Sequence, residues 1–149
     1  MEKFVKVTDE CTIAGQPSMQ DLSELETKGY KTVINFRENG EGNQPISPQE
    51  EERIVKDLGM EYIHFPMNLK TLTMDDIIRF DKIYSGLQQP VFAHCQRGVR
   101  AAVLLLINYA EKANMNGEEI LNYADKLGIH LKNTDAGDVI RKFVAKGDK

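Results

Sequence analysis

The sequence predicts an α/β fold with a central, mostly parallel sheet flanked by helices on both faces. Short runs of apolar and β-branched residues alternate along the chain with longer segments of helical periodicity. The order is two strands, helix, strand, helix, strand, helix, strand and then further helices. Because consecutive parallel strands need a crossover connection, this alternation favours parallel pairing and helices on both sides of the sheet.

The predicted strands are short and are bounded by turn residues. Gly15-Gln16-Pro17 forms a turn after the second strand, and Pro66 closes the fourth. Runs such as TVINF are rich in the β-branched and aromatic residues that strands favour. The strands are expected at residues 4–7, 11–14, 32–36, 61–65 and 91–93.

Capping residues mark the predicted helix starts, and glycines mark several of the ends. Ser18 and Asp21 have the spacing of a capping box, and Ser47 is followed by proline and then, three residues on, by Glu50. The segment after residue 100 is apolar on nearly every side, so its helix is expected in the interior. The helices are expected from Ser18 to Gly29, from Ser47 to about Leu58, from Thr73 to residues 85–87, from Arg100 to Ala113, from Asn116 to about Leu127, and over residues 135–145.

Composition limits both the organisation and the partners. The 149 residues contain no repeat, long linker or low-complexity tract, so a single domain over residues 1–149 is expected. A net charge of −4 argues against nucleic acid or an anionic membrane as the main partner. Two cysteines are too few for a disulfide framework, and no metal-ligand spacing occurs, so no metal and no other cofactor is expected. Residues 1–10 do not resemble a signal peptide and no apolar run could span a bilayer, which favours a cytoplasmic protein.

The stretch PVFAHCQRGVRAA, residues 90–102, carries most of the chemical information. A strand runs to His94, Cys95 follows, and a helix begins after a short loop. The N–H groups of the loop and of the first helical turn are unpaired, and the helix dipole is positive there. Both effects favour a thiolate at Cys95 and a bound oxyanion. Gly98 lets the backbone curl around the anion, and Arg100 can clamp it with two parallel hydrogen bonds.

Three loops are expected to meet at one edge of the sheet. In parallel sheets the ligand lies at the carboxyl ends of the strands. The loop after Phe36, the loop after Phe65 and the cysteine loop all leave from that edge. Their polar residues are therefore the candidates for a site that binds an anionic substrate.

These motifs resemble a known family. The pattern HCxxG followed by arginine, between a strand and a buried helix, resembles the phosphate-binding loop (P-loop) of cysteine-dependent protein phosphatases. More specifically, AGQP, KGYKTVINFRENGE, LGMEYIHFPM and VFAHCQRGVRAA together resemble the beta-lactamase-hydrolase-like family of phosphatase-like domains. The similarity spans roughly residues 7–113. It implies a dual-specificity-phosphatase-like α/β fold, here with extra C-terminal helices.

The resemblance also implies roles for individual residues. Cys95 would be the nucleophile and Arg100 would bind the substrate oxyanion. His94 would sit behind the cysteine and help to keep it ionised. The oxyanion would be cradled by the backbone amides of the loop, which comprises Gln96, Arg97, Gly98 and Val99. The side chain of Arg97 is expected mainly as a surface charge at the mouth of the site.

The cysteine loop departs from the usual phosphatase pattern at two positions. Arg100 lies five residues after Cys95 instead of six, a spacing that also occurs in the family named above and in rhodanese-type sulfurtransferases. Ala101 stands where serine or threonine usually stabilises the departing thiolate. These departures leave the identity of the transferred group open.

The general acid has no obvious counterpart. Phosphatases usually carry it as an aspartate in the loop after the strand that here ends near Phe65, but residues 66–71 contain no carboxylate. Asp75 and Asp76 remain as candidates, with helix capping as their alternative role. Glu38 and Glu41 are further candidates, with a solvated loop as the alternative. Without an acid, loss of an alkoxide leaving group would slow by about 10²–10⁴-fold.

Three functions remain open from the sequence. The first is a protein tyrosine phosphatase-type hydrolase of phosphate esters with a phosphoryl-enzyme intermediate on Cys95, favoured by the resemblance and by His94. The second is a sulfurtransferase that carries a persulfide on Cys95, favoured by the five-residue spacing. The third is a non-catalytic anion-binding module, favoured by the missing acid and hydroxyl.

Overall fold

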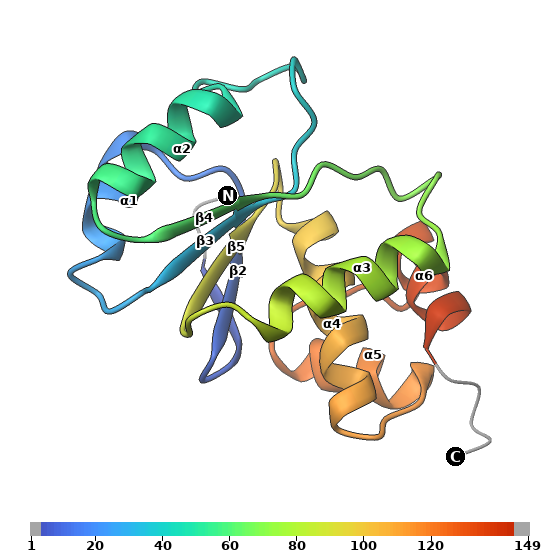
Figure 1. Ribbon diagram of the computed structural model, residues 1–149. Helices are drawn as coiled ribbons and strands as arrows, with labels where there is room; N and C mark the ends of the chain where they lie inside the picture. The colour runs from blue at the N-terminus through green and yellow to red at the C-terminus, as the bar shows by residue number, and fades with distance from the viewer. Residues whose placement is uncertain (1–3, 145–149) are drawn as a thin grey trace.

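The computed structural model describes residues 4–144, which form a five-stranded sheet between two layers of helices (Figure 1). The sheet order is β1-β2-β5-β3-β4. The hairpin pair β1 and β2 is antiparallel, and all other neighbouring strands are parallel. The predicted α/β class is therefore confirmed. The strands are β1 (Val5–Thr8), β2 (Cys11–Ala14), β3 (Thr32–Asn35), β4 (Glu61–His64) and β5 (Val91–His94).

Helices cover both faces of the sheet (Figure 1). All six lie within about two residues of their predicted positions, except that the first ends before Gly29. The prediction for the last helix extended to Ala145, which lies outside the described residues. The first face carries α1 (Met19–Leu25) and α2 (Pro48–Asp57), and the second carries α3 (Met74–Ser85), α4 (Val99–Lys112), α5 (Gly117–Lys126) and α6 (Asp135–Phe143).

Side-chain hydrogen bonds cap five of the six helices that the structure describes, and α4, which follows Gly98, has no side-chain cap. Ser18 with Asp21 forms a reciprocal capping box, and so do the equivalent pairs that begin α3 and α5. Ser47 caps α2 by accepting the Glu50 N–H at 3.1 Å. The Glu50 side chain does not complete a capping box there, but lies 3.6 Å from Arg53. Helix α2 therefore begins with one capping hydrogen bond, where a capping box supplies two.

The interior helix α4 connects the core to the cysteine loop. Nine of its residues, including the run Val103 to Ile107, are buried, as expected for a helix that is apolar on all sides. Its N-terminus lies at the carboxyl end of β5, in the middle of the sheet. Because β3 and β4 run parallel to β5, the chain leaves all three strands at the same edge. Of the helices that the structure describes, none is both long and apolar enough to cross a membrane.

Candidate active site

The Cys95 side chain lies at the base of the loop between β5 and α4. It is 1% exposed, and its sulfur accepts a hydrogen bond from the Gly98 N–H at 3.1 Å. Gly98 has a φ of 94°, a conformation that residues with a side chain rarely adopt, and this turn directs its amide back toward the sulfur. An N–H donor at a helix N-terminus stabilises a thiolate more than a thiol.

Two backbone hydrogen bonds attach this loop to the neighbouring strand and the turn after it. The Cys95 N–H donates to the Ala14 carbonyl at 3.3 Å, and the Gln16 N–H donates to the Gln96 carbonyl at 3.1 Å. The loop is therefore fixed at its start by β2 and at its end by α4. A cradle held in this way can bind an anion without first becoming ordered.

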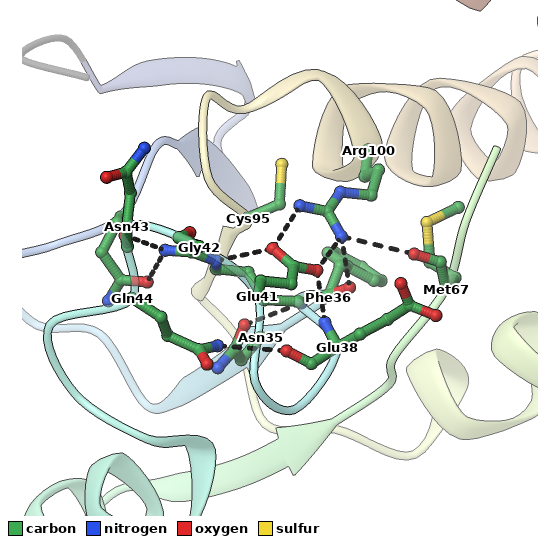
Figure 2. Close-up of polar contacts among 12 residues, drawn as sticks. Asn35, Phe36, Glu38, Glu41, Gly42, Asn43, Gln44, Met67, Cys95 and Arg100 are labelled. Carbon is green, nitrogen blue, oxygen red and sulfur yellow. Dashed lines mark hydrogen bonds and ion pairs between the residues drawn. The ribbon is translucent and has the colours of Figure 1, made fainter.

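The Arg100 guanidinium is held beside Cys95 by a carboxylate from the loop after β3 (Figure 2). Glu41 accepts two hydrogen bonds from it, Nη1 to Oε2 at 2.5 Å and Nη2 to Oε1 at 3.0 Å. The carbonyls of Phe36 and Met67 lie 3.4 Å from Nη1. The three loops predicted to converge thus meet at this guanidinium.

Glu41 is a charged partner of two arginines. It also accepts the Glu38 N–H at 2.5 Å and the Arg37 Nε–H at 2.9 Å. Burial opposes the charge, but the hydrogen bonds from Arg100, from the Glu38 amide and from Arg37 outweigh it and lower the pKa of Glu41 to about 2. Such a carboxylate has no proton to donate at neutral pH. The structure therefore argues against Glu41 as a general acid and gives it the geometry of a positioning residue.

The charge of Arg100 is reinforced in turn. Hydrogen bonding to Glu41 is the largest effect and raises the pKa of Arg100, while burial opposes it and the Cys95 sulfur adds a favourable charge interaction. A side-chain hydrogen bond with Cys95 also contributes, so part of the guanidinium lies next to the sulfur. Bidentate pairing on one edge fixes the plane of the guanidinium for recognition at the other.

The other predicted acid candidates do not reach the cysteine. Asp76 accepts hydrogen bonds from the Thr73 N–H and hydroxyl, each at 3.0 Å, so it caps α3 as its alternative role suggested. Asp75 is exposed in the same helical turn. Glu38 is exposed and contributes its backbone amide to Glu41. None of the three lines the cavity that contains Cys95.

Behind the loop, His94 and Glu51 form a fully buried pair. His94 Nε2 lies 2.5 Å from Glu51 Oε2, and Gln16 Nε2 donates to Oε1 at 3.3 Å. Burial, followed by the charge of Glu51, raises the pKa of the neighbouring Tyr62. His94 Nδ1 has no hydrogen-bond partner among the described residues. The carboxylate orients the imidazole, so any effect of His94 on Cys95 acts through the position of the loop rather than through a hydrogen bond.

Arg37 organises the loop that carries Glu41. Its side chain is fully buried directly after β3, and its guanidinium donates to Gln16 Oε1 at 2.8 Å, to the Asn43 carbonyl at 3.1 Å and to the Gly42 carbonyl at 2.7 Å. These bonds fold residues 38–44 back over the sheet edge. The loop therefore presents Glu41 to Arg100 in one defined geometry (Figure 2).

A cavity of about 420 Å³ opens above the cysteine. This is at the small end of the range for ligand pockets, roughly 300–1,000 Å³. Exposed Arg97 and Lys70 give its wall positive charge, and Asp135 gives it the only carboxylate among the described lining residues. The lining comprises Met67, Asn68, Leu69, Lys70, Cys95, Gln96, Arg97, Val99, Arg100 and Asp135.

The structure adds three polar residues that sequence reasoning did not select. Arg37 follows the strand run TVINF directly, so its place at the sheet edge was a usable signal. Glu51 is spaced from Pro48 and Val55, both buried, by three and four residues, which puts it on the inner side of α2. Asp135 had no local signal, because its position depends on how α6 packs against α4. Within residues 4–144 no group of three or more candidate ligands could hold a metal ion.

Comparisons with known proteins find relatives of this chain both in sequence and in structure. Residues 3–112 match the family model of the phosphatase-like domain of beta-lactamase hydrolase-like proteins. One such protein, from Agrobacterium fabrum, is 32% identical over 129 residues, which cover 87% of this chain but only 30% of that protein. The chain thus spans about 30% of the length of the curated relatives it matches.

Solved structures share the fold at low sequence identity. A phosphatase candidate from Neisseria meningitidis is 23% identical, with a TM-score of 0.77 over 93% of this chain and 96% of that one. P. aeruginosa TpbA in complex with phosphotyrosine is 13% identical, with a TM-score of 0.66 over 97% and 91%. These likenesses confirm the predicted phosphatase-like fold.

Proposed function

The chain belongs to the family of phosphatase-like domains of beta-lactamase hydrolase-like proteins, and we propose that it is a cysteine-dependent phosphatase. The proposed reaction is hydrolysis of phosphate monoesters, of the protein tyrosine phosphatase type, through a phosphoryl group carried on Cys95. One observation carries the proposal. The Cys95 sulfur accepts the Gly98 N–H at 3.1 Å, beside an Arg100 guanidinium that Glu41 holds in place.

Each step has a residue to serve it. The Cys95 thiolate attacks phosphorus, and the P–O bond to the organic group breaks. Loop amides and Arg100 bind the phosphoryl oxygens and stabilise the charge that builds up on them. Water then attacks the same phosphorus, the S–P bond breaks, and inorganic phosphate leaves with the thiolate restored. Glu41 acts as a positioning residue because it fixes the plane of the Arg100 guanidinium.

The cavity supports an anionic ester with a small apolar or aromatic group. Arg97 and Lys70 supply positive charge, while Met67, Leu69 and Val99 supply apolar wall. Phosphotyrosine is the first ester to test, because P. aeruginosa TpbA shares the fold and binds it in its own complex. In a site of this composition the ring contacts the apolar wall and the phosphate enters the cradle.

A sulfurtransferase is the second candidate, because two features of the loop favour it. Arg100 lies five residues after Cys95, the spacing of rhodanese-type loops, and the fully buried Ala101 offers no hydroxyl to a departing thiolate. In that reaction Cys95 would carry a persulfide, and the amides and Arg100 would bind the anionic end of the sulfur donor.

Parallel assays of wild type and Cys95→Ser separate these functions. One assay follows hydrolysis of an aryl phosphate, and the other follows thiocyanate formation from thiosulfate and cyanide. Cys95-dependent hydrolysis alone supports the phosphatase, and Cys95-dependent thiocyanate formation alone replaces it with the sulfurtransferase. If neither reaction depends on Cys95 while phosphate analogues still bind, the protein is an anion-binding module and the proposal is wrong.

A further inference from the structure

Loss of a poor leaving group needs a proton, and the expected source of that proton is absent. The segment that follows β4 contributes Met67, Asn68, Leu69 and Lys70 to the cavity, which are amide, apolar and cationic side chains. Glu41 is committed to Arg100 in its ionised form. A proton donor for the proposed phosphatase must therefore come from another part of the fold.

The one carboxylate among the described lining residues comes from the last helix. Asp135 is the first residue of α6 and shares the cavity wall with Cys95 and Arg100. No described residue gives its side chain a hydrogen bond or an ion pair. In the same helical turn, by contrast, Asp138 lies 3.0 Å from Arg141. Asp135 is thus an exposed, unpaired carboxyl on the wall of the cavity that contains Cys95.

The start of α6 is held rigidly, so Asp135 has a fixed place on the wall. The Thr134 hydroxyl donates to the Leu131 carbonyl at 2.7 Å and accepts the Gly137 N–H at 3.1 Å. A Cβ on Gly137 would come within 2.0 Å of the Leu131 oxygen, so only glycine permits this close approach. Ala136 and Ile140 are buried beneath, where α6 packs against α4. A carboxyl on a rigid element keeps the precise geometry that proton transfer requires.

We propose that Asp135 is the general acid of this phosphatase and donates its proton to the oxygen of the departing organic group. The inference rests on the proposed function. When the Cys95 thiolate attacks and the P–O bond breaks, the bonding electrons go to the leaving oxygen, which takes the proton from the Asp135 carboxyl. The resulting carboxylate then accepts a proton from the water that attacks phosphoryl-Cys95. The S–P bond breaks, and both the thiolate and the protonated Asp135 are restored.

The same residue could instead serve only to stabilise the helix N-terminus, where a negative charge interacts favourably with the dipole. Asp138 lies in the same turn and carries the same charge but does not line the cavity. Asp138→Asn is therefore the matched control. It removes one negative charge from the first turn of α6 and leaves the cavity wall intact.

The test compares kcat/KM for two esters that differ mainly in leaving group, 2,4-dinitrophenyl phosphate and phenyl phosphate. The dinitrophenolate leaves readily as an anion, whereas phenolate departure is assisted by a proton. Asp135→Asn is expected to lower kcat/KM for phenyl phosphate by about 10²-fold or more and to change that for the dinitrophenyl ester far less. Asp138→Asn is expected to leave the ratio between the two esters unchanged. Circular dichroism of each variant confirms that the fold is retained.

The outcomes separate this inference from the proposed function. Asp135→Asn could lower kcat/KM equally for both esters, or change it for neither, while hydrolysis still depends on Cys95. In that case Asp135 is not the general acid, and the proposed phosphatase function stands. The assignment is also overturned if Asp138→Asn lowers kcat/KM for phenyl phosphate, relative to the dinitrophenyl ester, as much as Asp135→Asn does. The loss of negative charge from the helix would then explain both results. If neither ester is turned over in a Cys95-dependent way, the proposed function and the inference are both wrong.

Discussion

The two cysteines lie at opposite ends of neighbouring strands, and both are buried and free. Cys11 is 4% exposed and Cys95 is 1% exposed, yet only Cys95 lies where strands end and a helix begins. Cys11 stands at the start of β2, opposite Val91 at the start of β5. The Thr8 hydroxyl donates a hydrogen bond to its sulfur at 3.9 Å. Burial, opposed by hydrogen bonds with Tyr84 and Thr8, raises the pKa of the Cys11 thiol.

This difference shows that the position of a cysteine in the topology, more than its burial, decides its chemistry. Both thiols are free, and they lie roughly 13 Å apart along the strand direction, too far for a disulfide. Cys95 has a helix N-terminus, an inward amide and a nearby guanidinium. Cys11 has a buried setting that favours the neutral thiol. The chain therefore contains its own control for a buried cysteine.

The largest expected contrast is in catalysis. Cys95→Ser should lower kcat/KM for an aryl phosphate by about 10³-fold or more, because it removes the proposed nucleophile. Cys11→Ser should stay within about twofold of wild type, because distant sites without shared partners act independently. Steady-state kinetics of the two variants provides the measurement. Comparable losses in both would mean that Cys95 has no special role.

A second contrast tests the support of Arg100. Glu41→Gln should lower kcat/KM by about 10- to 10²-fold, because a misplaced guanidinium no longer meets the phosphoryl oxygens. Glu38→Gln changes a carboxylate in the same loop that is exposed and does not line the cavity, so it should have no effect. Equal kinetics for Glu41→Gln and wild type would rule out the positioning role.

A third contrast concerns reactivity toward an alkylating agent. Iodoacetamide at pH 6.5 should modify Cys95 at least about 10-fold faster than Cys11, because the thiolate is the reactive form. Inorganic phosphate should protect Cys95 by filling the cradle and should not affect Cys11. Peptide mapping by mass spectrometry gives both rates. Faster reaction at Cys11, or no protection by phosphate, would contradict the predicted cradle.

The smallest expected effect is on the pH dependence of stability, which should differ between Glu41, near Cys95, and Cys11. The pKa of Glu41 is lowered from 4.5 to about 2 by folding, so its stabilisation is complete above pH 4.5 and is lost as the pH falls toward 2. We expect about 1–2 kcal/mol, reduced from the full shift because solvent partly screens the carboxylate. Urea unfolding should show that the difference in unfolding free energy between wild type and Glu41→Gln is smaller at pH 3 than at pH 7. An equal difference at the two pH values would count against the stabilising interactions of ionised Glu41.

The contribution of Cys11 to stability should change in the alkaline pH range instead. Because folding raises the pKa of Cys11, its contribution is present below the ordinary thiol value of 9.0 and is lost as the pH rises through the folded value. The difference in unfolding free energy between wild type and Cys11→Ser should therefore fall only at alkaline pH. A change at acid pH instead would point to another group.

Local signals predicted most of the fold and the place of the cysteine loop between a strand and a helix. Capping pairs such as Thr73 with Asp76 act within a single turn, and they form as expected. Strand-to-helix placement of Cys95 and Arg100 was likewise readable, because the apolar runs on either side define the junction. Each of these features depends on residues close together in the chain, so the sequence contains the information directly.

The polar side chains that hold the site residues in place come from distant parts of the sequence. Reasoning from the sequence largely missed these contacts. Glu51 meets His94 across 43 positions, and Glu41 meets Arg100 across 59. Glu41 was a candidate general acid, whereas the folded chain brings two arginines beside it that favour its ionised form. Asp135 reaches the cavity through helix packing alone. The spacing of residues in the sequence does not reveal contacts of this kind.

Trapping the reaction intermediate tests the central claim most directly. Wild-type protein is mixed with an aryl phosphate, quenched in acid during turnover, and digested for mass spectrometry. We predict a phosphoryl group on Cys95, absent from Cys95→Ser and present at the same site in Cys11→Ser. A phosphoryl group on a different residue, or turnover with no covalent intermediate at Cys95, would contradict the proposed mechanism.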